Sequence, residues 1–186
     1  MTCSCKELES QYSEDQCKCV KYREHFPDCK CEDESVSDHS PGRVADQEIL
    51  VRAVFSELKV GSDGEETPAS FLADPLNRGL SVDRLKYLND NSLVSSKRKD
   101  SRYEGYLRFT GARCRSVRSL LHNEHRLFCV YDSGTKHNPY HADICQNMYL
   151  QPGVENRKLK MKRFRWQLWK TFRELKEFPS ELLESQ

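Results

Sequence analysis

The segment from Ile49 to Phe55 is the clearest β-strand in this sequence, because every residue in it except Arg52 is apolar. A strand that is apolar on both of its faces is expected in the buried centre of a sheet. Arg52 interrupts the run, and burying a charge is costly unless the charge has a partner. We therefore expect Arg52 to pair with Asp83 or Glu48, to reach water at a sheet edge, or to bind an anionic ligand.

The stretch from Arg78 to Arg84 is expected to be a second short strand that continues into a helix. Its apolar residues alternate with Ser81 and Asp83, and helix-forming residues follow at 85–87. Ser81 and Asp83 would then share one face of the strand, which is either solvated or lines a cleft.

Further strand patterns follow toward the C-terminus, whereas long helical patterns are few. The expected strands are 106–111 and 114–117, with a kink at Gly111, then 127–131 and 141–145. The polar stretches 61–66 and 90–102 are expected to be loops. This pattern predicts an α+β fold with a mixed, mainly antiparallel sheet and flanking helices.

Changes in composition divide the chain of 186 residues into four parts. Its length suits one domain of ordinary size with an appendage. We expect a cysteine-rich zinc-binding module at 1–34, an acidic, serine-rich linker at 35–47, an α+β core domain at 48–150, and a basic amphipathic helix at 154–186 that packs on the core.

Three Cys-x-Cys pairs lie in the N-terminal part, and they are typical of a metal site. Tetrahedral Zn²⁺ takes four thiolates, so two pairs make one site. The site we favour uses the two pairs that enclose the shorter loop. The first pair would then join a second or shared site, or remain without a metal. His25 or His39 could also complete a second site. The favoured ligands are Cys17, Cys19, Cys29 and Cys31, and the first pair is Cys3 and Cys5.

The zinc would fold a segment that is too polar to fold alone, or it would build a surface that recruits a protein partner. A redox or disulfide role is the remaining alternative. The spacing is similar to that of small zinc-binding modules appended to bacterial proteins such as the preprotein translocase ATPase. That resemblance implies a zinc-bound interaction module.

Four motifs of the core follow one another in an order that resembles a family of small, uncharacterised bacterial proteins. The resemblance covers roughly residues 48–146 and implies a shared fold without implying a reaction. The motifs are Leu50-x-Arg52-x-Val54, Pro68-Ala69-Ser70, Gly79-Leu80-Ser81-Val82-Asp83 and Pro139-Tyr140-His141-Ala142-x-Ile144.

The placement of Arg52, Ser81 and His141 on three separate strands is similar to the layout of ADP-ribosyltransferase folds. The resemblance implies a nucleotide-using transferase in which Arg52 holds a pyrophosphate and Ser81 contacts the nicotinamide ribose. His141 or Asp143 would orient the acceptor, with Asp143 near the place of that family's catalytic glutamate. With Asp83 on the same face as Ser81, these are the candidate catalytic residues; the alternative is that each is an ordinary structural polar residue.

Apolar residues recur at helical spacing between Met161 and Leu175, which predicts a C-terminal amphipathic helix. Residues 157–173 contain no acidic side chain. The helix would pack on the core with its cations in solvent, contact the phosphates of RNA or DNA, or bind a membrane surface or partner helix. The residues available for a nucleic acid or protein partner are Lys158, Lys160, Lys162, Arg163, Arg165, Trp166 and Trp169.

The net charge of +1 excludes a uniformly basic protein. No apolar run reaches the roughly 18 residues of a membrane span, and the N-terminus lacks the pattern of a signal peptide, so we expect a cytoplasmic protein. Cysteines are normally reduced there, which favours metal ligation. The function that we expect is a zinc-binding bacterial adaptor or interaction module, with a nucleotide-using transferase and a nucleic-acid binder as alternatives.

Overall fold

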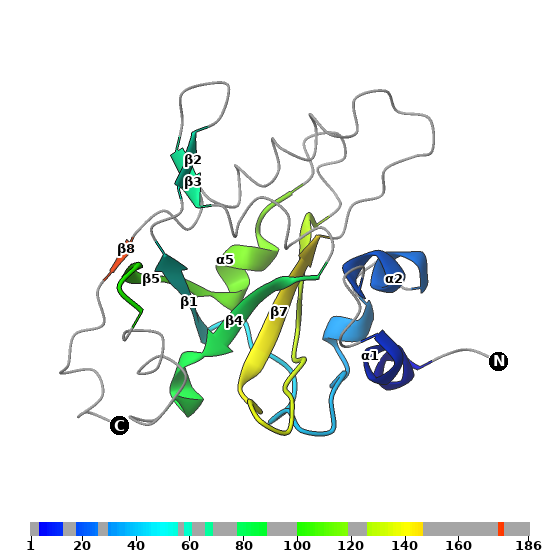
Figure 1. The fold of residues 1–186 in the computed structure, drawn as a ribbon. Helices are drawn as coiled ribbons and strands as arrows, with labels where there is room; N and C mark the ends of the chain where they lie inside the picture. The colour runs from blue at the N-terminus through cyan, green and yellow to red at the C-terminus, as the bar shows by residue number, and fades with distance from the viewer. Residues whose placement is uncertain are drawn as a thin grey trace, which may run out of the picture.

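A six-stranded antiparallel β-sheet forms the centre of the protein (Figure 1). The computed structural model describes residues 4–12, 18–25, 30–55, 58–60, 66–68, 78–88, 100–118, 126–146 and 175–176. The strands are β1 (Ile49–Phe55), β4 (Leu80–Arg84), β5 (Tyr103–Thr110), β6 (Phe128–Tyr131), β7 (His141–Gln146) and β8 (Leu175–Lys176). Their order is β6-β7-β4-β1-β5-β8, and each neighbouring pair is antiparallel. The predicted α+β class is confirmed, as is the strand at 49–55.

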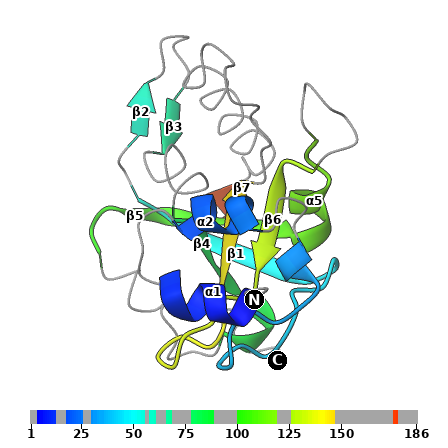
Figure 2. The same ribbon diagram turned by 90° about the vertical axis from the view of Figure 1, so that its right-hand side faces the viewer.

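Short helical elements surround this sheet. They are α1 (Cys5–Tyr12), α2 (Lys18–His25), η1 (Lys30–Glu32), η2 (Leu85–Tyr87) and α5 (Gly111–Arg115), while β2 (Leu58–Val60) and β3 (Glu66–Pro68) pair as a separate two-stranded sheet. The helix expected after Asp83 is therefore a single 3₁₀ turn. Figures 1 and 2 show α1 and α2, in blue, lying side by side next to β7.

Hydrophobic clusters cover both faces of the sheet, because side chains alternate between the faces along each strand. The larger cluster contains Leu50, Val54, Leu80, Val82, Leu107, Phe109, Phe128, Val130, Ala142 and Ile144, together with Val44, Cys114 and Leu127. The opposite face carries a cluster of Cys5, Leu8, Cys19, Tyr22, Cys31 and Val36 with Cys129, Tyr131 and Cys145. The N-terminal helices thus share a core with β6 and β7, whereas the sequence predicted a separate module at 1–34.

Residues 35–47, which the sequence predicted to be a linker, pack against the rest of the fold. Val36 and Val44 are buried, each in one of the two large clusters. The backbone N–H of Val36 donates to Asp132 Oδ1 at 2.9 Å, and the Ser37 hydroxyl donates to the Gly134 carbonyl. These two buried apolar residues and the hydrogen bonds hold the segment against the rest of the fold. The average composition of the segment is polar and does not reveal them.

The strand predicted at 114–117 is wrong over Cys114 and Arg115, which belong to α5. The helix begins after Thr110, whose hydroxyl accepts a hydrogen bond from the Arg113 N–H at 3.2 Å. A Cβ atom on Gly111 would lie 2.6 Å from the Ala45 carbonyl oxygen, so the close approach of these two segments requires glycine. A cap and a close contact decide this element, and neither follows from hydrophobic alternation.

The predicted C-terminal helix meets the described residues only at Leu175 and Lys176. These two residues form β8 and pair with Leu107 and Tyr106 of β5. The helix is wrong at this point, because the strand pairing satisfies the backbone groups across the sheet. The other residues of 154–186 lie outside the described part of the chain.

A buried ion pair joins the segment before β1 to the end of β4. Arg84 Nη2 donates to Glu48 Oε2 at 2.8 Å, and Arg84 Nε donates to the second oxygen. The same guanidinium donates to the carbonyls of Gly42 and Arg43. Burial alone would raise the pKa of Glu48, but the hydrogen bonds and charge of Arg84 outweigh it and lower the pKa. Glu48 was one of the partners expected for Arg52, but the cations that pair with it are Arg84 and Lys86.

Buried Glu32 covers the outer edge of the sheet at β6. Its carboxylate accepts a hydrogen bond from the Val130 N–H, and it pairs with Arg115 Nε at 3.1 Å and Arg126 Nη1 at 2.8 Å. An exposed edge strand offers unpaired backbone groups to other chains. The Glu32 carboxylate accepts a hydrogen bond from one of these edge N–H groups, and the two arginines compensate its charge.

We predict that Arg84→Met destabilises the protein by about 3 to 5 kcal/mol, because it leaves the Glu48 carboxylate buried without its main partner. Urea denaturation of the variant and the parent protein measures the difference. Lys86→Met is the matched control, since Lys86 also contacts Glu48, at 3.3 Å, but is 52% exposed. The control should cost less than about 1 kcal/mol. Equal stability of Arg84→Met and the parent protein would contradict the prediction.

Candidate functional site

A serine and a histidine from adjacent strands are hydrogen-bonded on the face that α1 and α2 cover. The antiparallel register pairs Ser81 with Asp143 and Asp83 with His141, which places all four residues on the same face. Ser81 Oγ lies 2.8 Å from His141 Nε2. Both residues are partly exposed, and the His141 side chain keeps 20% of its surface.

The other ring nitrogen of the histidine defines its tautomer. His141 Nδ1 lies 3.2 Å from the Ser133 carbonyl oxygen, which can only accept, and 3.1 Å from Ser133 Oγ. The Ser133 hydroxyl donates its own proton to Asp143 Oδ2. Nδ1 must therefore carry the hydrogen, so in the neutral imidazole Nε2 is the acceptor and Ser81 donates to it. The hydrogen bonds run in one direction from Ser81 through His141 and Ser133 to Asp143.

A buried ammonium group completes the network at Asp143. Lys18 Nζ of α2 donates to Asp143 Oδ2 at 2.6 Å and lies 3.5 Å from Glu9 Oε1 of α1. The Tyr22 hydroxyl donates to Glu9 Oε2 at 2.7 Å. The Lys18 side chain is only 7% exposed. The two N-terminal helices thus supply one cation and one carboxylate to a site whose serine and histidine lie on the sheet.

The surroundings of Asp143 keep it charged. Burial alone would raise the pKa of this carboxyl, but the charges of Lys18 and His141 and the hydrogen bonds from Lys18 and Ser133 outweigh it and lower the pKa. Gly79 has a φ of +95°, and a Cβ atom there would lie 2.9 Å from Asp143. Glycine at position 79 lets the backbone of β4 approach the carboxylate closely.

Arg52 does not join this face, contrary to the prediction that it lines one cleft with Ser81 and His141. The register pairs Val51 with Asp83, and alternation then places the Arg52 side chain on the other face. Its Nη1 donates to the backbone carbonyl of Ser81 at 2.7 Å. Asp83 shares the face with Ser81, but it accepts a hydrogen bond from Asn138 Nδ2 at 3.0 Å and takes no part in the chain of hydrogen bonds through His141.

The structure therefore brings together three of the five candidates, Ser81, His141 and Asp143, and adds residues that the sequence did not single out. Lys18 was the spacer of a Cys-x-Cys pair, and Ser133 belonged to no predicted element. Glu9 and Tyr22 lie in a segment that was assigned to a metal. The signal that could have identified these residues was a charged side chain on the buried face of a helix. It was not used, because the zinc prediction already explained the whole segment.

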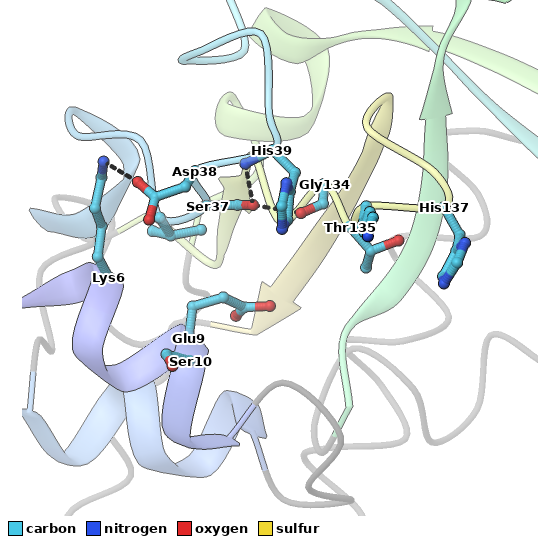
Figure 3. Close-up of a pocket in the computed structure, with 11 residues that line it drawn as sticks. Lys6, Glu9, Ser10, Ser37, Asp38, His39, Gly134, Thr135 and His137 are labelled. Carbon is cyan, nitrogen blue, oxygen red and sulfur yellow. Dashed lines mark hydrogen bonds and ion pairs between the residues drawn. The ribbon is translucent and has the colours of Figure 1, made fainter.

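A cavity of about 400 Å³ lies beside the network, between α1 and the segments 36–39 and 134–137 (Figure 3). Glu9 belongs to both the network and the cavity lining, and Gly134 follows Ser133 directly. Figure 3 shows Glu9 reaching from α1 toward the segment that carries Ser37. Lys6 Nζ and Asp38 Oδ1 form an ion pair of 2.6 Å at one side of the cavity.

The cysteines are joined across the fold. Disulfides link Cys5 to Cys31 and Cys19 to Cys145, and Cys129 is also disulfide-bonded. Cys114 is buried and unbonded, and burial raises the pKa of its thiol. Among the residues that the structure describes, no three His, Cys, Asp or Glu side chains form a group suited to a metal ion. Three expected zinc ligands, Cys3, Cys17 and Cys29, lie outside those residues, so the zinc site stays a prediction.

The remaining site predictions are not tested by the described residues. Lys158, Lys160, Lys162, Arg163, Arg165, Trp166 and Trp169 lie outside them. Across the described ranges, no helix is long and apolar enough to cross a membrane. Disulfides persist mainly in oxidising compartments, so the cytoplasmic location also stays a prediction.

Comparison with known proteins adds no assignment to this geometry. No protein-family model, curated protein or solved structure matches the chain. The hydrogen-bond network is therefore the observation from which a function has to be argued.

We predict that neutral His141 carries its proton on Nδ1, because the Ser133 carbonyl oxygen can only accept a hydrogen bond. Nitrogen-15 NMR of histidine-labelled protein distinguishes the two tautomers, and a His141→Gln variant assigns the signal. Ser133→Ala should leave the tautomer unchanged, since the backbone carbonyl remains. A proton on Nε2 in the neutral ring would contradict the network as described.

We predict that protein purified without reductant yields disulfide-linked peptides containing Cys5 with Cys31 and Cys19 with Cys145. Digestion after alkylation, followed by mass spectrometry, detects them, and elemental analysis of the same sample measures zinc. A disulfide and a zinc site compete for these sulfur atoms. Absence of these disulfides together with about one equivalent of bound zinc would instead support the site predicted from the sequence.

Proposed function

We propose that the protein is an acyl-transfer enzyme, of the esterase or thioesterase class, in which Ser81 is the nucleophile and His141 the general base. The 2.8 Å contact between Ser81 Oγ and His141 Nε2 carries the proposal. Serine is a weak nucleophile unless a neighbouring base takes its proton. The fixed tautomer presents the unprotonated nitrogen to that hydroxyl.

The steps follow from this arrangement. Ser81 Oγ forms a bond to the acyl carbon while its proton moves to His141 Nε2. The bond to the leaving oxygen or sulfur then breaks, and Nε2 returns the proton to the leaving group. Water attacks the acyl-serine with the same base and releases the acid. The charge of Asp143 stabilises the imidazolium between these steps, because its Oδ1 lies 3.7 Å from Nε2.

Ser133 and Lys18 support the pair without touching the reacting atoms. The Ser133 backbone carbonyl orients the imidazole, and its hydroxyl relays the hydrogen bond to Asp143. Lys18 keeps Asp143 ionised, so the imidazolium forms beside a negative charge. This arrangement performs the role of the carboxylate in a serine–histidine–aspartate triad through one intervening hydroxyl.

The geometry supports acyl transfer more directly than the functions expected from the sequence. A nucleotide-using transferase was predicted to hold pyrophosphate with Arg52, whose side chain lies on the opposite face from Ser81. An adaptor role rests on zinc, and binding of nucleic acid rests on residues 157–173; both remain predictions that are independent of the Ser81 site.

We predict that a fluorophosphonate probe labels Ser81, because an activated serine displaces fluoride from phosphorus. Intact-protein mass spectrometry measures the label, and peptide mapping locates it. Ser81→Ala should lose the label, and His141→Gln should slow labelling by about 10² to 10⁴-fold.

The matched control is Ser116→Ala, since Ser116 is exposed after α5 and its hydroxyl donates to the Arg113 carbonyl at 2.8 Å. This variant should label at the parental rate. Label on another serine, or equal labelling of the parent protein and Ser81→Ala, would refute the proposed nucleophile. Circular dichroism of each variant establishes that it is folded.

A further inference from the structure

Among the side chains that the structure describes, two buried carboxylates and one ammonium group lie between α1, α2 and β7. Two carboxylates, Glu9 and Asp143, share the single ammonium group of Lys18. Lys18 lies 2.6 Å from Asp143 but 3.5 Å from Glu9, so it compensates Glu9 less well. The Tyr22 hydroxyl donates to Glu9 at 2.7 Å but carries no charge. Glu9 is therefore the less well compensated of the two carboxylates.

Glu9 is the carboxylate of this cluster that also lines the cavity. Glu9 is buried, and it is one of the residues that line the 400 Å³ space. Burial raises the pKa of Glu9, although Lys18 and the Tyr22 hydroxyl act in the opposite direction. A cation placed against this carboxylate inside the cavity would relieve a charge that the fold leaves only partly compensated.

The rest of the lining is suited to a polar ligand with an anionic end. Lys6 is already paired with Asp38, so this pair adds no net charge. Lys136 lies at the exposed rim, where it can reach an anion. Hydroxyl and imidazole side chains also line the cavity, from Ser10, Ser37, His39, Thr135 and His137.

We propose that this cavity binds a small zwitterion, with its ammonium group against Glu9 and its anionic group toward Lys136. Free amino acids and short peptides have this chemistry. A volume of about 400 Å³ lies within the usual range for small-molecule sites, which begins near 300 Å³. The site is distinct from the Ser81 hydroxyl and does not depend on acyl transfer at that serine.

Thermal unfolding in the presence of the twenty common L-amino acids, one at a time, tests the proposal on the full chain. A ligand present at about a hundred times its dissociation constant should raise the Tm by about 5 to 10 °C. The N-acetyl derivative of the same amino acid is the ligand control, because it keeps the side chain and carboxylate but lacks the ammonium group. It should give no shift.

Two variants locate the binding. Glu9→Gln keeps the shape and an acceptor for the Tyr22 hydroxyl but removes the charge, so the Tm shift should disappear. Lys136→Met should weaken binding about tenfold in isothermal titration calorimetry with the amino acid found in the screen. Lys21→Met is the matched control; Lys21 pairs with Glu24 on the outer side of α2 and does not line the cavity, so its variant should bind normally.

The proposal fails if no amino acid shifts the Tm of the parent protein, or if the N-acetyl derivative shifts it equally. It also fails if folded Glu9→Gln binds with parental affinity. Where Glu9→Gln does not fold, the comparison of free and N-acetylated ligands on the parent protein still decides the role of the ammonium group. Fluorophosphonate labelling of Ser81 is a separate measurement, so either proposal can fail alone.

Discussion

One ammonium group, Lys18 Nζ, holds together the polar layer between the N-terminal helices and the sheet. It is buried and contacts a carboxylate from each side, Asp143 on β7 and Glu9 on α1. Burial alone would lower the pKa of Lys18, but the two carboxylates outweigh it and raise the pKa, so the group stays charged. Without it, two carboxylates would face each other in a buried space, and a lost partner of this kind costs about 3 to 5 kcal/mol. The packing of α1 and α2 on β7 therefore depends on this cation.

The position of Lys18 is in turn fixed by its covalent neighbour. Cys19 is joined to Cys145, and the two residues are 126 positions apart in the sequence. A cross-link that closes a loop of this length stabilises a fold by about 4 to 5 kcal/mol in the chain-entropy description. Because Lys18 precedes Cys19 and Asp143 lies two residues before Cys145, the same bond brings the ammonium group and the carboxylate together. Ion pair and disulfide thus reinforce each other at one point of contact.

Hydrophobic pattern was sufficient to predict the centre of the fold. The apolar run at 49–55 and the alternation around Ser81 gave strands that the structure confirms, and with them the side of β4 on which Ser81 and Asp83 lie. What alternation could not provide was the register between strands, and the register determines that Arg52 faces away from His141. Elements fixed by single contacts were also missed, as at Thr110 and Gly111, where a cap and a close approach start a helix inside an expected strand.

The N-terminal half of the site was missed for a different reason. Closely spaced cysteines have two physical uses, as metal ligands or as cross-links, and spacing alone does not distinguish them. A metal hypothesis pairs each cysteine with its sequence neighbours, which keeps the segment separate from the sheet. The disulfides instead pair Cys19 with a residue of β7 and place α2 on the sheet, so Lys18 becomes buried. The partner of one cysteine therefore decides whether Lys18 is a spacer in a metal loop or the counter-ion of Asp143.

The direction of the hydrogen bonds is the feature of this layer on which the proposed chemical role depends. For packing alone, His141 could use either tautomer, since the ring fills the same volume in both. The Ser133 carbonyl accepts and cannot donate, and the Ser133 hydroxyl gives its proton to Asp143, so the proton on the ring is restricted to Nδ1. This leaves one lone pair, on Nε2, and the side chain beside it is the Ser81 hydroxyl. Burying this polar layer costs desolvation free energy. Within it, the unprotonated Nε2 of neutral His141 faces the partly exposed Ser81 hydroxyl, which is the arrangement that nucleophilic catalysis requires.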